Sequence, residues 1–441
     1  KSFWHPFAAG EALVALGSFG DSMGHPYSAA YPRPLYAAAM GGSAGYAAFG
    51  PGSIPDAPCN LRIRALSACL EYAYREDLWG AADPLRREWT EPLRIAWADT
   101  AYGAYDRLYR SFPAQTPKSP HHQRTFLCTW GDFKEERYDL REIADRGAAH
   151  TPAEMLVLDD RWESFTGSGE PHRERFPKFE EDLAYIRERG FRLAFWQAIA
   201  WVDRPEEAGL SAEDLLCGPD GLPRIWNWSG DPLSVTERPN NHYCLDPSSP
   251  RAREFLAERT RRIVRRYRPA ALKLDFGYGI PGPDVCAPRD PALRGERLCA
   301  ELLRIVGEAA KSVDPDITII YYGIHPLLHD LYDMINLDDL GDAGEGPEYE
   351  RLGHSQRCVW AALAAGHGMA VNTSTGYYWD TLESILLDTA VVGAGGITLG
   401  AVDRLGQRLS FAQELRWRAL SEWRRRTCGW KPLWLDAELG S

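Results

Sequence analysis

The chain has 441 residues, a length that fits two or three ordinary domains or one large barrel with additions. Its 16 Trp, 20 Tyr and 15 Phe exclude a disordered protein, because a solvated chain does not carry so many aromatic side chains. The net charge of −12 argues against a broad nucleic-acid surface, and no apolar run approaches the roughly 20 residues that a membrane span needs.

The first 120 residues are predicted to be rich in β-structure. Residues 1–50 are dense in Gly, Ala, Tyr and Pro, which is typical of short strands joined by turns. Apolar and polar residues alternate at 61–66 and 93–97, which predicts half-buried strands, and residues 100–112 have the pattern of a connecting helix. A Pro-rich stretch follows. We therefore expect a β-rich N-terminal domain with its linker helix over residues 1–120.

Beyond this boundary, short apolar runs alternate with helical patterns. The helix predicted at 249–267 opens with Ser249 as its N-cap and Pro250 in its first position. Eight apolar runs in alternation with helices predict an α/β fold, a (β/α)₈ TIM barrel. We expect this catalytic barrel over residues 121–428 and a C-terminal tail over 429–441. The eight runs are residues 125–130, 154–160, 191–196, 270–275, 317–322, 334–339, 369–374 and 390–400.

A doubly wound open sheet is the alternative fold. Its nucleotide-binding form carries a Gly-rich turn after the first strand, and residues 129–137 have none. Residues 201–245, between the third and fourth predicted strands, form an excursion dense in Trp, Pro and Gly. Long insertions in barrels usually build the entrance to the substrate site, so we expect that role here.

Charged and aromatic side chains gather at the ends of the predicted strands. In a parallel barrel the catalytic groups lie at the C-terminal ends of the strands. Aromatic faces stack on sugar rings, charged groups bind hydroxyls, and two carboxylates on different strands can divide the work of glycoside cleavage. The sequence therefore predicts a carbohydrate site. The strand-end residues include Trp130, Asp159, Asp160, Trp196, Lys273, Asp275, Tyr322, Asp338 and Asp339.

Two of these strand ends carry the candidate catalytic acids. Asp275 ends the most apolar strand, and Lys273 projects from the same face two residues earlier. The simpler interpretation of these two residues is an ion pair that closes the barrel top. Asp338 and Asp339 are adjacent acids, and one of them can hold a raised pKa and act as the acid. Their simpler interpretation is a helix cap or a loop carboxylate.

Several of these segments resemble glycoside hydrolase family 36 of clan D. EMLVLDDRWE resembles the second-strand motif of that family, FRLAFWQAIAWV its third strand and HYCLDPSSPRAREFL the approach to its fourth. AALKLDFG resembles the Lys-Trp-Asp motif that carries the nucleophile, and INLDDLGD resembles the stretch that carries the acid/base. The resemblance implies a (β/α)₈ barrel behind an N-terminal β-sandwich, here much shortened. It also implies retaining cleavage of terminal α-galactosides, with α-N-acetylgalactosaminides as a variant.

The resemblance also implies roles for individual residues. Asp275 matches the nucleophile, Asp338 matches the acid/base best, and Asp339 is the alternative. The remaining matches are substrate-binding residues: Lys273 for the sugar, Asp159 and Asp160 for the galactose O4 and O6 hydroxyls, and Trp162 and Trp196 for the pocket wall.

The chain also departs from the family pattern. Arg161 replaces the expected Gly, Leu274 the expected Trp, and Phe276-Gly277 the usual Met-Asn. Tyr321–Pro326 stands where the family has a Cys-Ser-Gly-Gly-rich loop that helps recognise the 2-position substituent. The exact sugar therefore stays open. The alternative functions are another α-glycosidase, or a carbohydrate-binding homologue whose catalysis is weak or redirected.

No cofactor and no metal site are predicted. His325 and His329 have an i, i+4 spacing, but Pro326 follows the first and no third ligand is near. Nine cysteines without a CxxC pair favour buried thiols in a reducing cytoplasm, although Lys1 in place of Met leaves removal of an upstream segment open. We expect a carbohydrate partner and neither nucleic acid nor membrane, and a homo-oligomer is compatible with the sequence.

Overall fold

The structure is a computed structural model of the chain. It describes residues 38–42, 44–54, 59–64, 69–74, 92–114, 119–121, 124–132, 139–150, 153–226, 242–276, 286–294, 296–321, 326–328, 330–336, 367, 370–372, 396–398, 410–412, 415 and 418–419.

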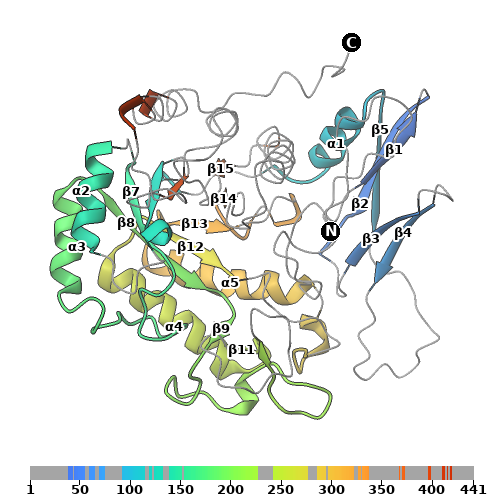
Figure 1. The fold of residues 1–441 in the computed structure, drawn as a ribbon. Helices are drawn as coiled ribbons and strands as arrows, with labels where there is room; N and C mark the ends of the chain where they lie inside the picture. The colour runs from blue at the N-terminus through green and yellow to red at the C-terminus, as the bar shows by residue number, and fades with distance from the viewer. Residues whose placement is uncertain are drawn as a thin grey trace.

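Eight parallel strands form the largest sheet (Figure 1). Their spatial order is β16-β6-β7-β8-β12-β13-β14-β15, so the last described strand of this sheet lies beside its first, with Gly396 opposite Phe126. A parallel sheet that curls so that its eighth strand pairs with its first is of the TIM-barrel type, and the predicted (β/α)₈ fold class is confirmed. The strands are β6 (Phe126–Cys128), β7 (Met155–Leu158), β8 (Arg192–Ala198), β12 (Ala271–Asp275), β13 (Thr318–Tyr321), β14 (Met334–Asn336), β15 (Ala370–Asn372) and β16 (Gly396–Thr398), one in each predicted run.

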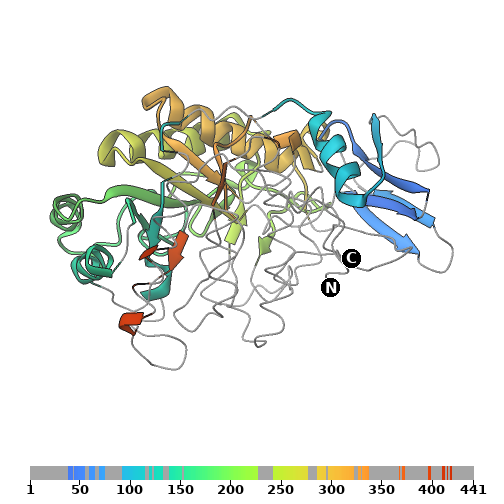
Figure 2. The same ribbon diagram turned by 90° about the horizontal axis from the view of Figure 1, so that it is seen from above.

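Helices cover the outside of this sheet. They are α2 (Leu140–His150), α3 (Phe179–Glu188), α4 (Pro250–Tyr267) and α5 (Glu296–Val313), and Figure 2 shows them beside the strands rather than within the barrel. The start of α4 is as predicted: the Ser249 hydroxyl accepts hydrogen bonds from the N–H groups of Arg251 and Ala252, and Pro250 is the first helical residue. None of the described helices is long and apolar enough to cross a membrane.

The barrel has two distinct apolar clusters, one on each face of the sheet. The larger one lies mainly between strands and helices, and it extends to Trp196 and Phe276 at the strand ends and to Tyr105 of the N-terminal part. The smaller one fills the barrel interior and consists of Phe126, Cys128, Met155, Val157, Ala194, Ala270, Ala271, Ile320 and Met334. Because side chains alternate along a strand, the residues two and four positions beyond an inward residue also point inward. This alternation places Asp159, Lys273 and Asp275 inside the barrel, toward its C-terminal end.

The described residues between 38 and 98 are rich in β-structure, as predicted, and lie on the right in Figure 1. β1 (Ala38–Gly42), β2 (Gly45–Pro51) and β5 (Leu93–Ala98) form an antiparallel sheet, and β3 (Cys59–Arg64) pairs with β4 (Cys69–Tyr74). Helix α1 (Ala101–Arg110) packs against β2 and β5. The domain limits at residues 120 and 428 stay predictions.

A small antiparallel sheet interrupts the barrel between β8 and α4. It contains β9 (Trp201–Val202), β10 (Ile225–Trp226) and β11 (His242–Cys244), with β11 in the middle. Four short 3₁₀ turns complete the described elements: η3 (Thr129–Asp132), η4 (Ala212–Asp214), η5 (Pro291–Leu293) and η6 (Pro326–Leu328). Arg289 ties this region together, since its guanidinium donates to Asp246 and to the carbonyls of Ala212, Glu213 and Leu215.

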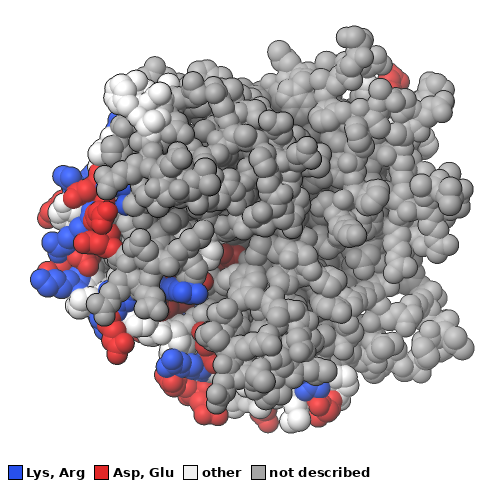
Figure 3. Space-filling view, in the orientation of Figure 1, with Lys and Arg blue, Asp and Glu red and all other residues white. Residues whose placement is uncertain are grey.

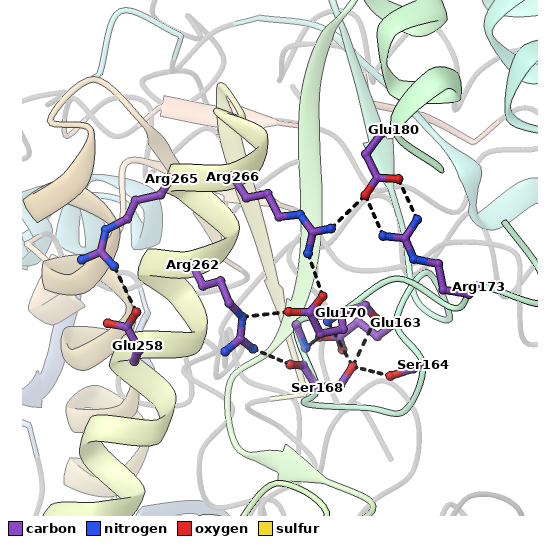
Figure 4. Close-up of polar contacts among 11 residues, drawn as sticks. Glu163, Ser164, Ser168, Glu170, Arg173, Glu180, Glu258, Arg262, Arg265 and Arg266 are labelled. Carbon is purple, nitrogen blue, oxygen red and sulfur yellow. Dashed lines mark hydrogen bonds and ion pairs between the residues drawn. The ribbon is translucent and has the colours of Figure 1, made fainter. Parts of the chain in front are cut away.

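The surface over α2 and α3 mixes charges of both signs. Basic and acidic side chains alternate there on the face seen in Figure 3. Figure 4 shows how such charges join the loop after β7 to α4: Arg262 and Arg266 both contact Glu170, and Arg266 also contacts Glu180, which binds Arg173. This network holds the loop that follows the strand-end aspartates of β7 against the outside of the barrel.

Candidate active site

A buried ion pair lies inside the barrel at the C-terminal end of β7. Lys273 Nζ is 2.7 Å from Asp159 Oδ2, and both side chains are only 3% exposed. The same oxygen accepts a hydrogen bond from Cys128 Sγ over 2.7 Å, and the Asp159 N–H donates to Thr129 Oγ1. Burial raises the pKa of the Cys128 thiol, so the thiol stays protonated and donates. Side chains from two other strands, Cys128 of β6 and Lys273 of β12, therefore bind one carboxylate oxygen at the end of β7.

Asp160 lies at the next position and is half-buried. Its N–H donates to Asp159 Oδ1 over 2.9 Å, and its own Oδ1 accepts from the Arg161 N–H over 2.6 Å. Arg161 adopts a left-handed backbone with φ 65°, which turns the chain sharply after the strand. Loss of solvent and the nearby charge of Asp159 raise the pKa of Asp160 to about 7. This carboxyl can therefore accept or donate a proton near neutral pH.

Asp275 ends β12 and is 8% exposed. Its Oδ2 accepts a hydrogen bond from Trp196 Nε1 over 2.9 Å, and its Oδ1 accepts from the Phe276 N–H over 2.6 Å. Burial raises the pKa of Asp275 to about 6, while the charge of Lys273 and the Trp196 hydrogen bond oppose this rise. At neutral pH Asp275 is a fixed carboxylate with two donors on its oxygens and a lysine on the same face of the strand.

The three predicted tryptophans have different surroundings. Trp196 is fully buried on β8 and contacts Asp275 directly. Trp162 is also fully buried, but its ring packs among Phe179, Phe195 and Tyr267, and its Nε1 donates to the Trp196 carbonyl over 2.9 Å. Trp130 is partly exposed and packs against the inner cluster of the barrel. Trp196 and Trp130 thus lie inside the barrel, and Trp162 lies between sheet and helices.

The other predicted site residues, Tyr322, Asp338 and Asp339, lie outside the described residues, and so do His325 and His329. The structure therefore brings together six of the predicted site residues: Asp159, Asp160, Lys273, Asp275, Trp196 and Trp130. Among the residues that the structure describes, no group of three His, Cys, Asp or Glu side chains could hold a metal ion.

Two groups that bind the site aspartates are not among the residues predicted from the sequence. Cys128 was interpreted only as a buried thiol, although its place two residues before Trp130 on an inward face signals a side chain near Asp159. The Phe276 N–H was missed because a main-chain donor has no signature in the side-chain pattern. The excursion after β8 contacts this same residue, since Trp201 stacks on Phe276.

The loop after β7 is fixed by a second buried carboxylate. Glu163 is 4% exposed and accepts hydrogen bonds from the N–H groups of Gly167 and Gly169 over 3.0 and 2.6 Å. Arg259 of α4 is 1% exposed, supplies a nearby positive charge and donates to the Ala198 carbonyl at the end of β8. Ala198 is opposite Asp275 in the sheet, so this group supports the strand end that carries the carboxylate.

The chain is similar to known proteins in its fold, and no significant match was found in its sequence. No protein-family model matches the chain, and no curated protein has a significant match in sequence. Solved structures do match. An α-galactosidase from Thermus thermophilus, in complex with stachyose, has a TM-score of 0.60 at 18% identity over 87% of this chain and 79% of that one.

Two further structures match with similar scores. A family GH36 α-galactosidase from Geobacillus stearothermophilus has a TM-score of 0.55 at 13% identity, over 89% of this chain and 55% of that one. A GH31 dextranase from Flavobacterium johnsoniae, complexed with glucose, has a TM-score of 0.60 at 11% identity, over 87% of this chain and 48% of that one. At these identities the likeness establishes a fold shared with glycoside hydrolases of this barrel type.

Proposed function

We propose that the chain is a retaining α-glycoside hydrolase that removes a terminal α-linked sugar, with α-galactosides as the first candidates. The observation that carries the proposal is the Asp275 carboxylate, held inside the barrel at a strand end by Trp196 Nε1 and the Phe276 N–H. A carboxyl group acts as a nucleophile only in its ionised form. The pKa of about 6 for Asp275 leaves it ionised at neutral pH.

The reaction has two displacements. Asp275 attacks the anomeric carbon, the bond to the leaving oxygen breaks, and Asp338 gives that oxygen its proton. Asp338, now ionised, then takes a proton from water, whose oxygen attacks the anomeric carbon and releases Asp275. Asp339 is the alternative for the acid/base. The sugar leaves with the α-configuration that it had in the substrate.

The polar groups around Asp275 support a sugar as the substrate. Asp160 and the Lys273–Asp159 pair lie beside it and can bind hydroxyls through charge-assisted hydrogen bonds. The partly exposed Trp130 offers an aromatic face of the kind on which sugar rings stack. The structural neighbours named above, two α-galactosidases and a dextranase, favour galactose first and glucose second. The cytoplasmic location and oligomeric state stay predictions.

Hydrolysis of p-nitrophenyl α-D-galactopyranoside by the wild type and by Asp275→Ala tests the proposal. We expect turnover by the wild type, release of α-galactose as the first product seen by NMR, and a loss of at least about 10³-fold in the variant. Azide should restore activity to Asp275→Ala and give β-galactosyl azide, because azide enters from the side that the carboxylate has vacated. Wild-type turnover that releases β-galactose first would refute the retaining mechanism.

The same reagent distinguishes the acid/base from the nucleophile. Asp338→Ala with azide should give α-galactosyl azide, since Asp275 still performs the first displacement; if Asp339→Ala does so instead, Asp339 holds the role. A panel of aryl α-glucosides and α-N-acetylgalactosaminides defines the sugar. A protein that binds galactose by calorimetry but turns over none of these substrates would be the carbohydrate-binding homologue.

A further inference from the structure

The residue after the candidate nucleophile has an unusual backbone. Phe276 has φ 58°, in the left-handed region that is disfavoured for a residue with a Cβ. Only three non-glycine residues in the described part of the chain have a positive φ. This conformation accompanies the contact of the Phe276 N–H with Asp275 Oδ1 over 2.6 Å. Contacts with neighbouring residues must therefore stabilise the left-handed backbone of Phe276.

A buried aromatic stack holds the side chain of Phe276. Its ring lies face to face with Trp201, with centroids 3.9 Å apart and an angle of 17° between the planes. The other face of Trp201 carries the imidazole of His242, with centroids 4.1 Å apart. The exposures are 5% for Phe276, none for Trp201 and 6% for His242. The edge of Phe276 also meets Trp196, the other donor to Asp275.

The outer end of this stack is anchored to the loop after β7. His242 Nδ1 contacts Asp203 Oδ1, and Asp203 Oδ2 accepts a hydrogen bond from the Thr166 N–H over 3.1 Å. Strand pairing fixes the stack from below, since Cys244 of β11 is opposite Trp201 of β9. A continuous set of contacts thus runs from the β7 loop to the carboxylate of Asp275.

We infer that Phe276 is a positioning residue for Asp275, and that the stack of Phe276, Trp201 and His242 works by holding the left-handed backbone at residue 276. The inference rests on the proposed role of Asp275 as nucleophile. With the ring gone and the Cβ kept, the backbone relaxes toward negative φ, and the N–H turns away from Oδ1. The carboxylate then loses one of its two donors and its fixed aim. Misplacement of a reacting group by about 1 Å can reduce the rate about 10²-fold.

Two substitutions at this position separate positioning from packing. Phe276→Ala removes the ring but keeps the Cβ that opposes a left-handed backbone, whereas Phe276→Gly removes both and permits that backbone without strain. A purely structural role predicts that Gly is at least as damaging as Ala, because it loses more buried surface and more chain order. Positioning predicts the opposite order of activity.

The experiment compares kcat/KM for p-nitrophenyl α-D-galactopyranoside in the two variants. We expect a fall of about 10- to 100-fold in Phe276→Ala, with the Kd for D-galactose within about threefold of the wild type, and at least about threefold more activity in Phe276→Gly than in Phe276→Ala. Phe191→Ala is the matched control: Phe191 is also 5% exposed but precedes β8, at the opposite end of the barrel strands. It should lower the melting temperature and leave kcat/KM within about threefold.

Activity in Phe276→Ala equal to that of Phe191→Ala, or in Phe276→Gly no higher than in Phe276→Ala, would overturn the inference. Crystal structures of the two position-276 variants give a readout that does not need turnover. The N–H of residue 276 should remain within hydrogen-bond distance of Asp275 Oδ1 in the Gly variant and not in the Ala variant. If the wild type has no turnover, the proposed function fails, and these structures alone decide whether Phe276 positions the carboxylate.

Discussion

Trp196 Nε1 donates a hydrogen bond to Asp275 Oδ2 over 2.9 Å, from β8 to the neighbouring strand β12. This bond favours the ionised carboxylate and so works against burial, which raises the pKa of Asp275 to about 6. Since only the ionised form can attack a sugar, the activity of the wild type should fall as the pH drops through about 6. Asp160, whose pKa is raised to about 7 and whose charge interacts with that of Asp275, should spread this fall over a wider pH range. We refer to this falling part of the pH profile as its acid limb.

Trp196→Phe should move the acid limb to higher pH. Removal of the donor takes away a contact that stabilises the charged form, and a hydrogen bond to a charged group corresponds to roughly one pH unit. The measurement is the pH profile of kcat/KM for an aryl α-galactoside. Trp97→Phe is the control, because Trp97 is 66% exposed on β5 and its replacement should leave the limb in place. An identical limb in Trp196→Phe would contradict the assignment of Asp275.

Lys273→Met should destabilise the protein strongly, by about 3–5 kcal/mol, because it leaves the buried charge of Asp159 without its partner. Urea unfolding measures the effect. The double variant Asp159→Asn/Lys273→Met should be more stable than Lys273→Met alone, since neither buried charge remains. Arg204→Met, which breaks an exposed pair with Glu207, should change stability far less. Unfolding of the single variant Asp159→Asn completes the cycle, and additive losses of stability in the two single variants would show that the pair does not interact.

The position of the strand-end aspartates could be predicted from the sequence because it depends on local patterns. Eight apolar runs in alternation with helices specify a parallel barrel, and the two-residue period places Asp159 and Asp275 on the inward face. Both rules need only neighbouring residues. Tyr322, Asp338 and Asp339 follow from the same rules and stay predictions.

The supports of Asp275 could not be predicted in this way. Phe276, Trp201 and His242 belong to three separate segments, and nothing periodic in the chain relates them. Their contact depends on how β9 and β11 pack on the end of β12, which is a tertiary effect. The same holds for Glu163 and Arg259, whose residue types are usually exposed and which are here almost fully buried.

Asp160→Asn should change how stability depends on pH. Burial raises the pKa of Asp160 from 3.8 to about 7 in the folded protein. Between these values the folded state holds a proton that the unfolded chain has released, so the free energy of unfolding falls as pH rises through this window. Asparagine has no proton to release in this range and keeps the acceptor for the Arg161 N–H.

Chemical denaturation at a series of pH values compares the two proteins. From pH 3.8 to above 7, the wild type should lose on the order of 2–4 kcal/mol relative to Asp160→Asn. The raised pKa of Asp275 acts in the same direction in both proteins and largely cancels. Asp99→Asn, at the exposed end of β5, should leave the wild-type dependence unchanged. Parallel curves for wild type and Asp160→Asn would mean that Asp160 is solvated and ordinary.

Gly167 and Gly221 form a matched pair that tests the loop after β7. Both have a left-handed backbone, with φ +92° and +77°. A Cβ on Gly167 would lie 2.7 Å from the Trp201 carbonyl oxygen and 2.9 Å from Arg259 Nη1, whereas a Cβ on Gly221 would have nothing within 4 Å. Gly221→Ala should therefore cost about 1 kcal/mol of stability, from the backbone alone, and Gly167→Ala about 2–4 kcal/mol.

The two substitutions should differ in activity as well. The atom nearest to the new methyl group at position 167 is the carbonyl oxygen of Trp201. The Trp201 ring stacks on the ring of Phe276, and the Phe276 N–H donates to Asp275 Oδ1. A shift of the Trp201 backbone is thus passed to the candidate nucleophile through two contacts. We expect kcat/KM to fall about tenfold in Gly167→Ala and to stay within about twofold in Gly221→Ala. Equal activity in both, together with the expected difference in stability, would show that the loop supports the fold without reaching the carboxylate.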